Sequence, residues 1–191
     1  MKTVYTLTRE GWLNLAVERL HPMFTEAGAT IPEKVRVSCG WPSVRALAHS
    51  KRRIGECWSP SVSADQTIEM FISPSLGKAD QVLPVLVHEL VHAAVGNEAG
   101  HRAPFSRLAA KLGLVKPWTA TTASPELAKK LSTLMPEAYP HAAIDRTKQP
   151  KQGTRMVKVI CPGCGYTIRT TNKWIEVGLP TCVCGEQMEE A

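Results

Sequence analysis

The chain has 191 residues, enough for one domain with a hydrophobic core and a small appendage. It is 43% hydrophobic and 21% charged, and it has no run of about 18 apolar residues, which excludes a transmembrane helix and a membrane partner. No apolar segment of signal-peptide length precedes Arg9 and Glu10, so we expect a cytoplasmic protein. The net charge of +6 is compatible with a polyanionic partner such as nucleic acid.

The first third of the chain predicts one helix and three short strands. From about Thr8 to Ala27 apolar residues recur at helical spacing, and Gly28 is a natural stop. Strand-like segments follow at 34–38, 54–58 and 67–72, the last two separated by the turn-rich S-P-S-V-S-A-D.

Three helices are expected next. The segment Val82–Val95 is apolar around its whole circumference, which predicts a buried helix, and Asp80 can cap it. A second helix is predicted at Ala103–Leu112, ended by Gly113, and a third from Ser124 to about Met135.

The buried helix carries the motif H-E-L-V-H, with His88, Glu89 and His92. Burying these groups without partners is costly, and a metal ion would offset that cost. Positions i and i+4 lie on one side of a helix, so both imidazoles can bind one zinc ion, and Glu89 can deprotonate a water molecule there. The alternative is two core histidines beside a solvated glutamate, but a buried helix offers these residues no water.

A catalytic zinc site usually has three protein ligands. His101 is the preferred third ligand, because it follows a glycine-containing loop that can turn the chain back and it precedes a new helix. Glu98 is the rival, and the spacing is not that of the metzincins. The other histidines, His21, His49 and His141, are expected to be solvated or in the core.

The C-terminal segment is rich in cysteine. Residues 136–153 have no apolar period and are predicted as a linker, and 154–191 as a zinc ribbon, which is too small to fold on a hydrophobic core alone. Four cysteines in two close pairs are expected to bind a structural zinc ion: Cys161, Cys164, Cys182 and Cys184. The remaining two, Cys39 and Cys57, are predicted to be buried apolar residues.

Seven basic residues and no acidic one lie between Arg146 and Lys173. Tyr166 and Trp174 could stack on bases, although both could equally be core aromatics. The candidate nucleic-acid contacts are Lys148, Lys151, Arg155, Lys158, Arg169 and Lys173. A second basic cluster, Lys51–Arg53, is predicted to be a solvated turn rather than a phosphate site.

The motif H-E-L-V-H, the later Gly100, His101 and Phe105, the following helix and the C-terminal cysteines together resemble the SprT-like zinc metallopeptidases, to which Spartan is related. The compact size is similar to that of bacterial or phage members. The resemblance implies an α+β, zincin-like domain over residues 1–145, mostly helical with a small β-sheet, followed by the ribbon. It also implies His88, His92 and His101 as ligands, Glu89 as general base, and peptidase activity tied to nucleic acid. One departure is that three residues, not two, separate His101 from Phe105.

We therefore predict a two-zinc metallopeptidase, with one catalytic and one structural ion, that cleaves DNA-associated protein substrates. One alternative is a non-proteolytic regulator that binds nucleic acid or a polymerase through the ribbon. Another is a peptide-deformylase-like hydrolase with Cys57, in G-E-C-W, as a ligand.

Overall fold

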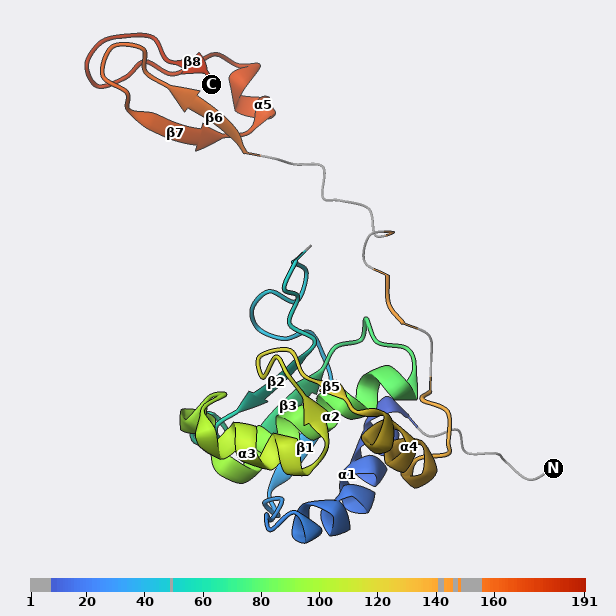
Figure 1. Ribbon diagram of the computed structural model, residues 1–191. Helices are drawn as coiled ribbons and strands as arrows, with labels where there is room; N and C mark the ends of the chain where they lie inside the picture. The colour runs from blue at the N-terminus through green and yellow to red at the C-terminus, as the bar shows by residue number, and fades with distance from the viewer. Residues whose placement is uncertain (1–7, 49, 141–142, 146–147, 149–155) are drawn as a thin grey trace, which may run out of the picture. The chain divides into compact units, whose positions relative to one another are not determined.

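A computed structural model describes residues 8–48, 50–140, 143–145, 148 and 156–191 (Figure 1). The chain divides into two compact units, Met1–Asp145 and Arg146–Ala191. The predicted α+β class is confirmed: helices and small sheets occur together. No helix in the described ranges is long and apolar enough to span a bilayer. Five residues named above, His49, His141, Arg146, Lys151 and Arg155, lie outside the described residues.

Helix α1 (Arg9–Glu26) forms one wall of the N-terminal core. Its N-cap is Thr8, whose Oγ1 accepts a hydrogen bond from the amide of Gly11 at 3.0 Å. Gly28, with a φ of 78°, follows its C-terminus. Apolar residues at helical spacing line its buried face: Trp12, Leu13, Ala16, Leu20, Met23 and Phe24.

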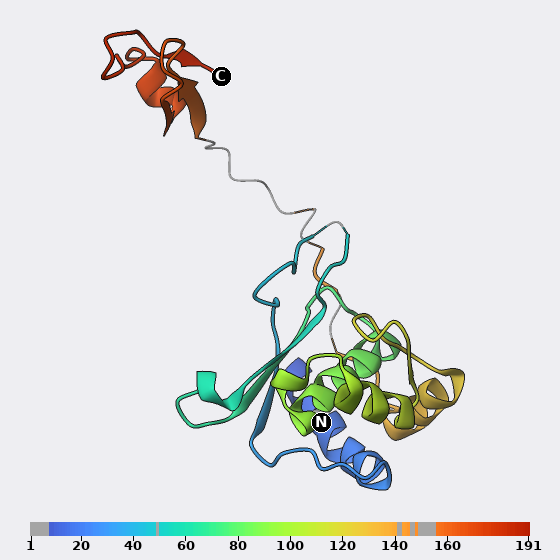
Figure 2. The ribbon, with the colours of Figure 1, turned by 60° about the vertical axis from the view of Figure 1, so that its left-hand side comes forward.

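The main sheet contains β1 (Val35–Cys39), β2 (Gly55–Trp58) and β3 (Ile68–Ile72) in the order β1-β3-β2. Strand β3 runs parallel to β1 and antiparallel to β2. The helices lie on one side of this sheet, as Figure 2 shows. Because β2 is the last strand in this order, it is an edge strand of the sheet, and it packs against α2.

Helix α2 (Ala79–Val95) is the central helix of the unit. Its buried apolar residues cover most of its circumference, as predicted: Val82, Leu83, Leu86, Val87, Leu90, Val91 and Ala93. The predicted cap was wrong. The N-cap is Lys78, without a side-chain hydrogen bond, and Asp80 lies in the first turn, where its charge still favours the helix dipole.

Two further helices of the unit follow α2 in the chain. A 3₁₀ turn, η2 (Asn97–Ala99), leads to α3 (Ala103–Lys111), and Ser124 caps α4 (Pro125–Leu134) through the amide of Leu127. Between α3 and α4, strands β4 (Leu114–Val115) and β5 (Thr122–Ala123) form a small hairpin. This hairpin was not predicted, because two-residue strands carry no detectable alternation.

The start of the segment predicted as a linker packs against α1. The indole Nε1 of Trp12 donates to the carbonyl of Glu137 at 3.0 Å, and Arg19 pairs with the Glu137 carboxylate at 2.7 Å. Tyr139 is buried edge-on against the ring of Trp12. The N-terminal unit thus includes residues beyond 136. Individual contacts hold these residues in place, and such contacts require no regular spacing of apolar residues in the sequence.

The C-terminal unit is built on the three-stranded antiparallel sheet β7-β6-β8, with β6 at Val157–Ile160, β7 at Thr167–Thr170 and β8 at Glu189–Glu190. A short helix, α5 (Asn172–Ile175), follows β7. In the described part of this unit, four buried residues form the core cluster, and two of them are cysteines: Val159, Cys161, Cys182 and Met188. So small a core requires a further constraint for stability.

Candidate functional site

The three histidines predicted as ligands converge at one point. His88 and His92 lie one turn apart on α2, and His101 returns to them after η2. Nε2 of His101 lies 3.2 Å from Nε2 of His88 and 3.2 Å from Nε2 of His92. The return of the chain depends on Gly96 and Gly100, both at positive φ, which side-chain-bearing residues rarely adopt.

The spacing of these nitrogens fits a zinc ion. With Zn–N bonds of about 2.0–2.1 Å, a tetrahedral ion holds its ligand nitrogens about 3.3 Å apart. All three imidazoles pack on the fully buried ring of Phe105, with ring centroids 4.5 to 4.9 Å away. Phe105, which follows His101 in the motif, therefore forms the apolar surface on which the three histidines pack.

The imidazoles are held neutral, which is the state that binds a metal. Burial lowers the pKa of His88 to about 3 and that of His92 to about 4, and the neighbouring imidazoles add to both shifts. Burial, together with the charge of Arg53, also lowers the pKa of His101.

Thr121, in the hairpin loop before β5, orients the first of these rings. Its Oγ1 lies 2.8 Å from Nδ1 of His88. An Nδ1–H donated to this hydroxyl leaves the lone pair on Nε2, the atom that faces the other two histidines. Hydrogen bonds of this kind fix the tautomer of metal-binding histidines.

Glu89 is buried beside the cluster. Burial raises the pKa of its carboxyl to about 8, against the opposing charge of Arg53. The side chain occupies the space above Gly55 of β2, where a Cβ would lie 2.3 Å from Oε1 of Glu89. The carboxyl thus lies in a defined position between α2 and the edge strand.

The rival ligands are not part of the cluster. Among the described residues, the group of converging donor atoms contains the three histidines alone, without Glu98 or Cys57. The exposed Glu98 carboxylate lies over Gly96, and burial raises the pKa of the Cys57 thiol to about 12, which disfavours the thiolate. The remaining described histidine, His21, lies on α1 outside this cluster.

The four C-terminal cysteines form a second cluster. Cys161 and Cys164 follow β6, and Cys182 and Cys184 precede β8. The Sγ atoms of Cys161 and Cys184 lie 3.5 Å apart, as do those of Cys164 and Cys182, and no disulfide joins them. A tetrahedral zinc with Zn–S bonds of about 2.3 Å holds its sulfurs about 3.8 Å apart, so this set also fits zinc.

Both cysteine pairs lie on tight turns despite their different spacing. The amide of Gly165 donates to the carbonyl of Cys161, and that of Gly185 to the carbonyl of Cys182, both at 2.9 Å. Both glycines have positive φ. Gly185 closes the turn of the second pair, so Cys182 and Cys184 both reach the cluster although only one residue separates them.

The predicted nucleic-acid contacts are only partly described. Lys158 and Arg169 face each other across β6 and β7, and both are exposed. Lys173 lies on α5 with its Nζ 5.1 Å from the centre of the Trp174 ring. Lys148 is exposed, and Lys151 and Arg155 lie outside the described residues. Tyr166 and Trp174 are exposed, so neither is a core aromatic.

A cleft of about 720 Å³ opens over the histidine cluster. One wall is residues 53–57, which include Gly55–Cys57 of β2, and another is the hairpin segment 119–122. The cleft is also lined by His88, Glu89, His92 and His101. Three contributors were missed in the sequence: Gly55, Thr121 and the basic loop that begins at Arg45. Each reaches the site through long-range packing.

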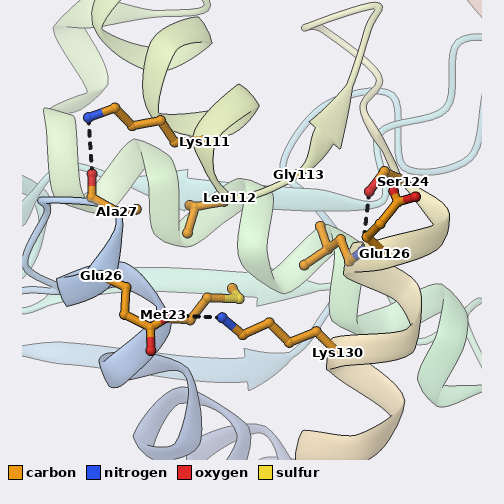
Figure 3. A pocket seen from close by; sticks show the side chains of 10 residues that line it. Met23, Glu26, Ala27, Lys111, Leu112, Gly113, Ser124, Glu126 and Lys130 are labelled. Carbon is orange, nitrogen blue, oxygen red and sulfur yellow. Dashed lines mark hydrogen bonds and ion pairs between the residues drawn. The ribbon is translucent and has the colours of Figure 1, made fainter.

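A smaller cavity of about 420 Å³ lies where α1 and α3 end and α4 begins (Figure 3). Lys130 pairs there with Glu26 at 2.9 Å, and Lys111 donates to the carbonyl of Ala27 at 3.3 Å. None of the described residues that line this cavity is a histidine or a cysteine. Its charged groups are already engaged with each other or with the backbone, so the larger cleft is the better candidate for chemistry.

No protein-family model matches the sequence, and no curated protein or solved structure is significantly similar to it. The likeness to SprT-like peptidases rests on the motif residues alone.

Proposed function

We propose that the N-terminal unit is a zinc-dependent peptidase of the SprT-like type that acts on DNA-associated proteins. The supporting observation is that three neutral imidazoles converge within hydrogen-bonding distance in a cleft that also contains a buried carboxyl, Glu89. This donor set is typical of a catalytic zinc site rather than a closed structural one, because a fourth position remains for water or substrate.

His88, His92 and His101 would hold the ion. Bound there, zinc would supply a Lewis acid that polarises a peptide carbonyl and makes a water molecule more acidic. Glu89 would take the proton from the attacking water and deliver it to the leaving amine. Its burial and its contact with Gly55 keep the carboxyl from turning into solvent.

Strand β2 would hold the substrate backbone. It is an edge strand in the described sheet and it lines the cleft. The amide of Ser73 donates to the carbonyl of Ile54, and Asn97 Nδ2 donates to that of Cys57 from outside the sheet. Because antiparallel pairing alternates, Gly55 and Cys57 direct their backbone groups away from β3. An extended peptide can pair with such an edge.

The test is cleavage by zinc-loaded full-length protein of casein and of a DNA-binding protein, with and without single-stranded DNA, and of the chain itself. We expect cleavage that a chelator abolishes and added zinc restores. Absence of cleavage on all three substrates by protein with a full zinc content would contradict the proposal and favour the non-enzymatic regulator.

We further propose that the C-terminal unit binds nucleic acid. Two exposed aromatic rings, Tyr166 and Trp174, favour this role, together with the adjacent cations Lys158 and Arg169. Like charges opposite each other on paired strands are unfavourable without an anion to bridge them. Salt-sensitive binding of single-stranded DNA, weakened in Trp174→Ala, would support the role, and binding independent of salt would contradict it.

A further inference from the structure

The cleft has a basic wall that the proposed chemistry does not use. Four cations line it, Arg45 and the run Lys51, Arg52 and Arg53, all from the loop between β1 and β2. Arg53 pairs with Glu56. Arg45, Lys51 and Arg52 are all exposed. Among the described residues, none of these three cations takes part in an ion pair.

The loop is anchored to the edge strand rather than free in solvent. Glu56, buried on β2, accepts hydrogen bonds from the amide and hydroxyl of Ser43 at 2.7 and 2.8 Å, and from Arg53. The Glu56 carboxylate thus holds the loop at Ser43, near its start, and at Arg53, near its end. The amide of Arg53 also donates to the carbonyl of Arg45 at 3.3 Å.

The backbone of the loop has a defined, unusual conformation. Arg45 and Lys51 have φ values of 57° and 50°, a region that residues with side chains seldom adopt. Such residues persist where surrounding contacts determine the conformation, and they concentrate at binding sites. The sequence prediction of a plain solvated turn at Lys51–Arg53 therefore missed its anchoring at the cleft.

The charge of the cleft is unbalanced. Its two carboxyl groups are Glu56, which is engaged with Arg53, and Glu89, which is buried behind the cluster. A cleft lined by one sign of charge concentrates ligands of the opposite sign. Arginine in particular recognises planar carboxylates with two parallel hydrogen bonds.

The lining favours a peptide carboxylate over a nucleic acid. Apart from the imidazoles, no aromatic side chain among the described residues lines the cleft, so the described lining offers no other ring on which a base could stack. A peptide paired with β2 would instead project alternate side chains from its backbone along the wall that carries the three cations.

We propose that Arg45, Lys51 and Arg52 form a specificity subsite that selects peptide substrates with Asp or Glu side chains beside the scissile bond. This inference rests on the proposed peptidase function, because it names the substrate class of that same cleft. Binding and cleavage can nevertheless be measured separately.

The experiment uses zinc-loaded, full-length Glu89→Gln protein, which should bind peptides without consuming them. Two fluorescein-labelled peptides of equal length are compared by anisotropy, one alternating Glu with Ala and its twin alternating Gln with Ala. We expect the Glu peptide to bind about tenfold more tightly, the scale for three exposed ion pairs, with a preference that declines as salt is raised.

Matched variants locate the effect. Replacing Arg45, Lys51 and Arg52 together by Gln should abolish the preference without changing zinc content. The control replaces Lys78, Arg107 and Lys129, three exposed cations outside the cleft, and should preserve it. If the first triple variant fails to fold, the single variants Arg45→Gln and Arg52→Gln should each reduce the preference.

Equal binding of the two peptides, or a preference unchanged by the cleft variants, would overturn the inference. Tighter binding of single-stranded DNA that is lost in the cleft variants but not in the control would overturn it in favour of a nucleic-acid subsite. If the Glu preference is found but the wild-type protein cleaves no peptide, the subsite stands and the proposed peptidase function fails.

Discussion

The carboxyl of Glu89 and the backbone of Gly55 are in such close contact that residue 55 has no room for a side chain. A Cβ there would lie 2.3 Å from Oε1 of Glu89 and 2.5 Å from Cγ1 of Val85. The proposed general base on α2 and the edge strand β2 therefore fix each other's position.

Gly55→Ala should impair cleavage while leaving zinc bound, because the atoms nearest the added methyl belong to Glu89 and Val85 and not to a histidine. We expect a loss approaching the roughly 10²-fold or more of a missing general base. The check is a double-mutant cycle with Glu89→Gln. If Gly55 acts through Glu89, the double variant should cleave no worse than Glu89→Gln alone, and a fully active Gly55→Ala protein would contradict the assignment.

Thr121→Val should weaken zinc binding at the histidine cluster, because it removes the hydroxyl that lies 2.8 Å from Nδ1 of His88. Loss of such a partner typically reduces metal affinity by about 10- to 100-fold. A competition titration with a chelator measures this change. Thr119→Val is the matched control, since Thr119 lines the same cleft but Thr121 supplies the hydroxyl beside Nδ1 of His88. Equal affinities of the two variants would count against an orienting role for Thr121.

The chain should bind two zinc ions through separate ligand sets. A protein ending at Asp145 should retain one, and Cys164→Ser should lose the other together with the thermal stability of the C-terminal unit, because structural metal sites are coupled to folding. Metal content by mass spectrometry tests both. Cys57→Ser is the control and should keep both ions; loss of zinc there would revive the deformylase-like alternative.

The C-terminal cations should contribute to nucleic-acid binding through phosphates. Replacing Lys158 and Arg169 by Ala should lower the affinity for single-stranded DNA and reduce the dependence of log K on log salt by about 1.4, which is two contacts at about 0.7 each. A titration series between low and physiological salt measures the slope. An unchanged slope in the double variant would place the contacts elsewhere.

The sequence was most informative where local rules decide the structure. Helix α1 lies within the predicted range from about Thr8 to Ala27, before the predicted stop at Gly28, and α2 is buried as its apolar circumference requires. His88 and His92 had to share one side of α2 because of helix geometry alone. Among the described residues, the histidine cluster includes His101 and not Glu98, and the assignment of His101 as a zinc ligand stays a prediction.

The parts of the site that depend on long-range packing could not be predicted. The contact between Gly55 and Glu89 depends on how β2 packs on α2. Thr121 reaches His88 through a hairpin of two-residue strands. Lys51–Arg53 looked like a surface turn because the sequence does not reveal that Glu56 anchors both ends of its loop.

The central claim is that His88, Glu89 and His92, on the buried helix α2, form part of a hydrolytic zinc site. The substitution Glu89→Gln tests this claim most directly. Glutamine is nearly isosteric with glutamate but cannot accept the proton of the attacking water. Zinc content, melting temperature and cleavage should be measured on this variant beside wild type and His92→Ala. We predict that Glu89→Gln keeps its zinc and its melting temperature and loses cleavage by roughly 10²-fold or more, whereas His92→Ala loses the metal and is destabilised. A Glu89→Gln protein that cleaves as fast as the wild type would contradict the account.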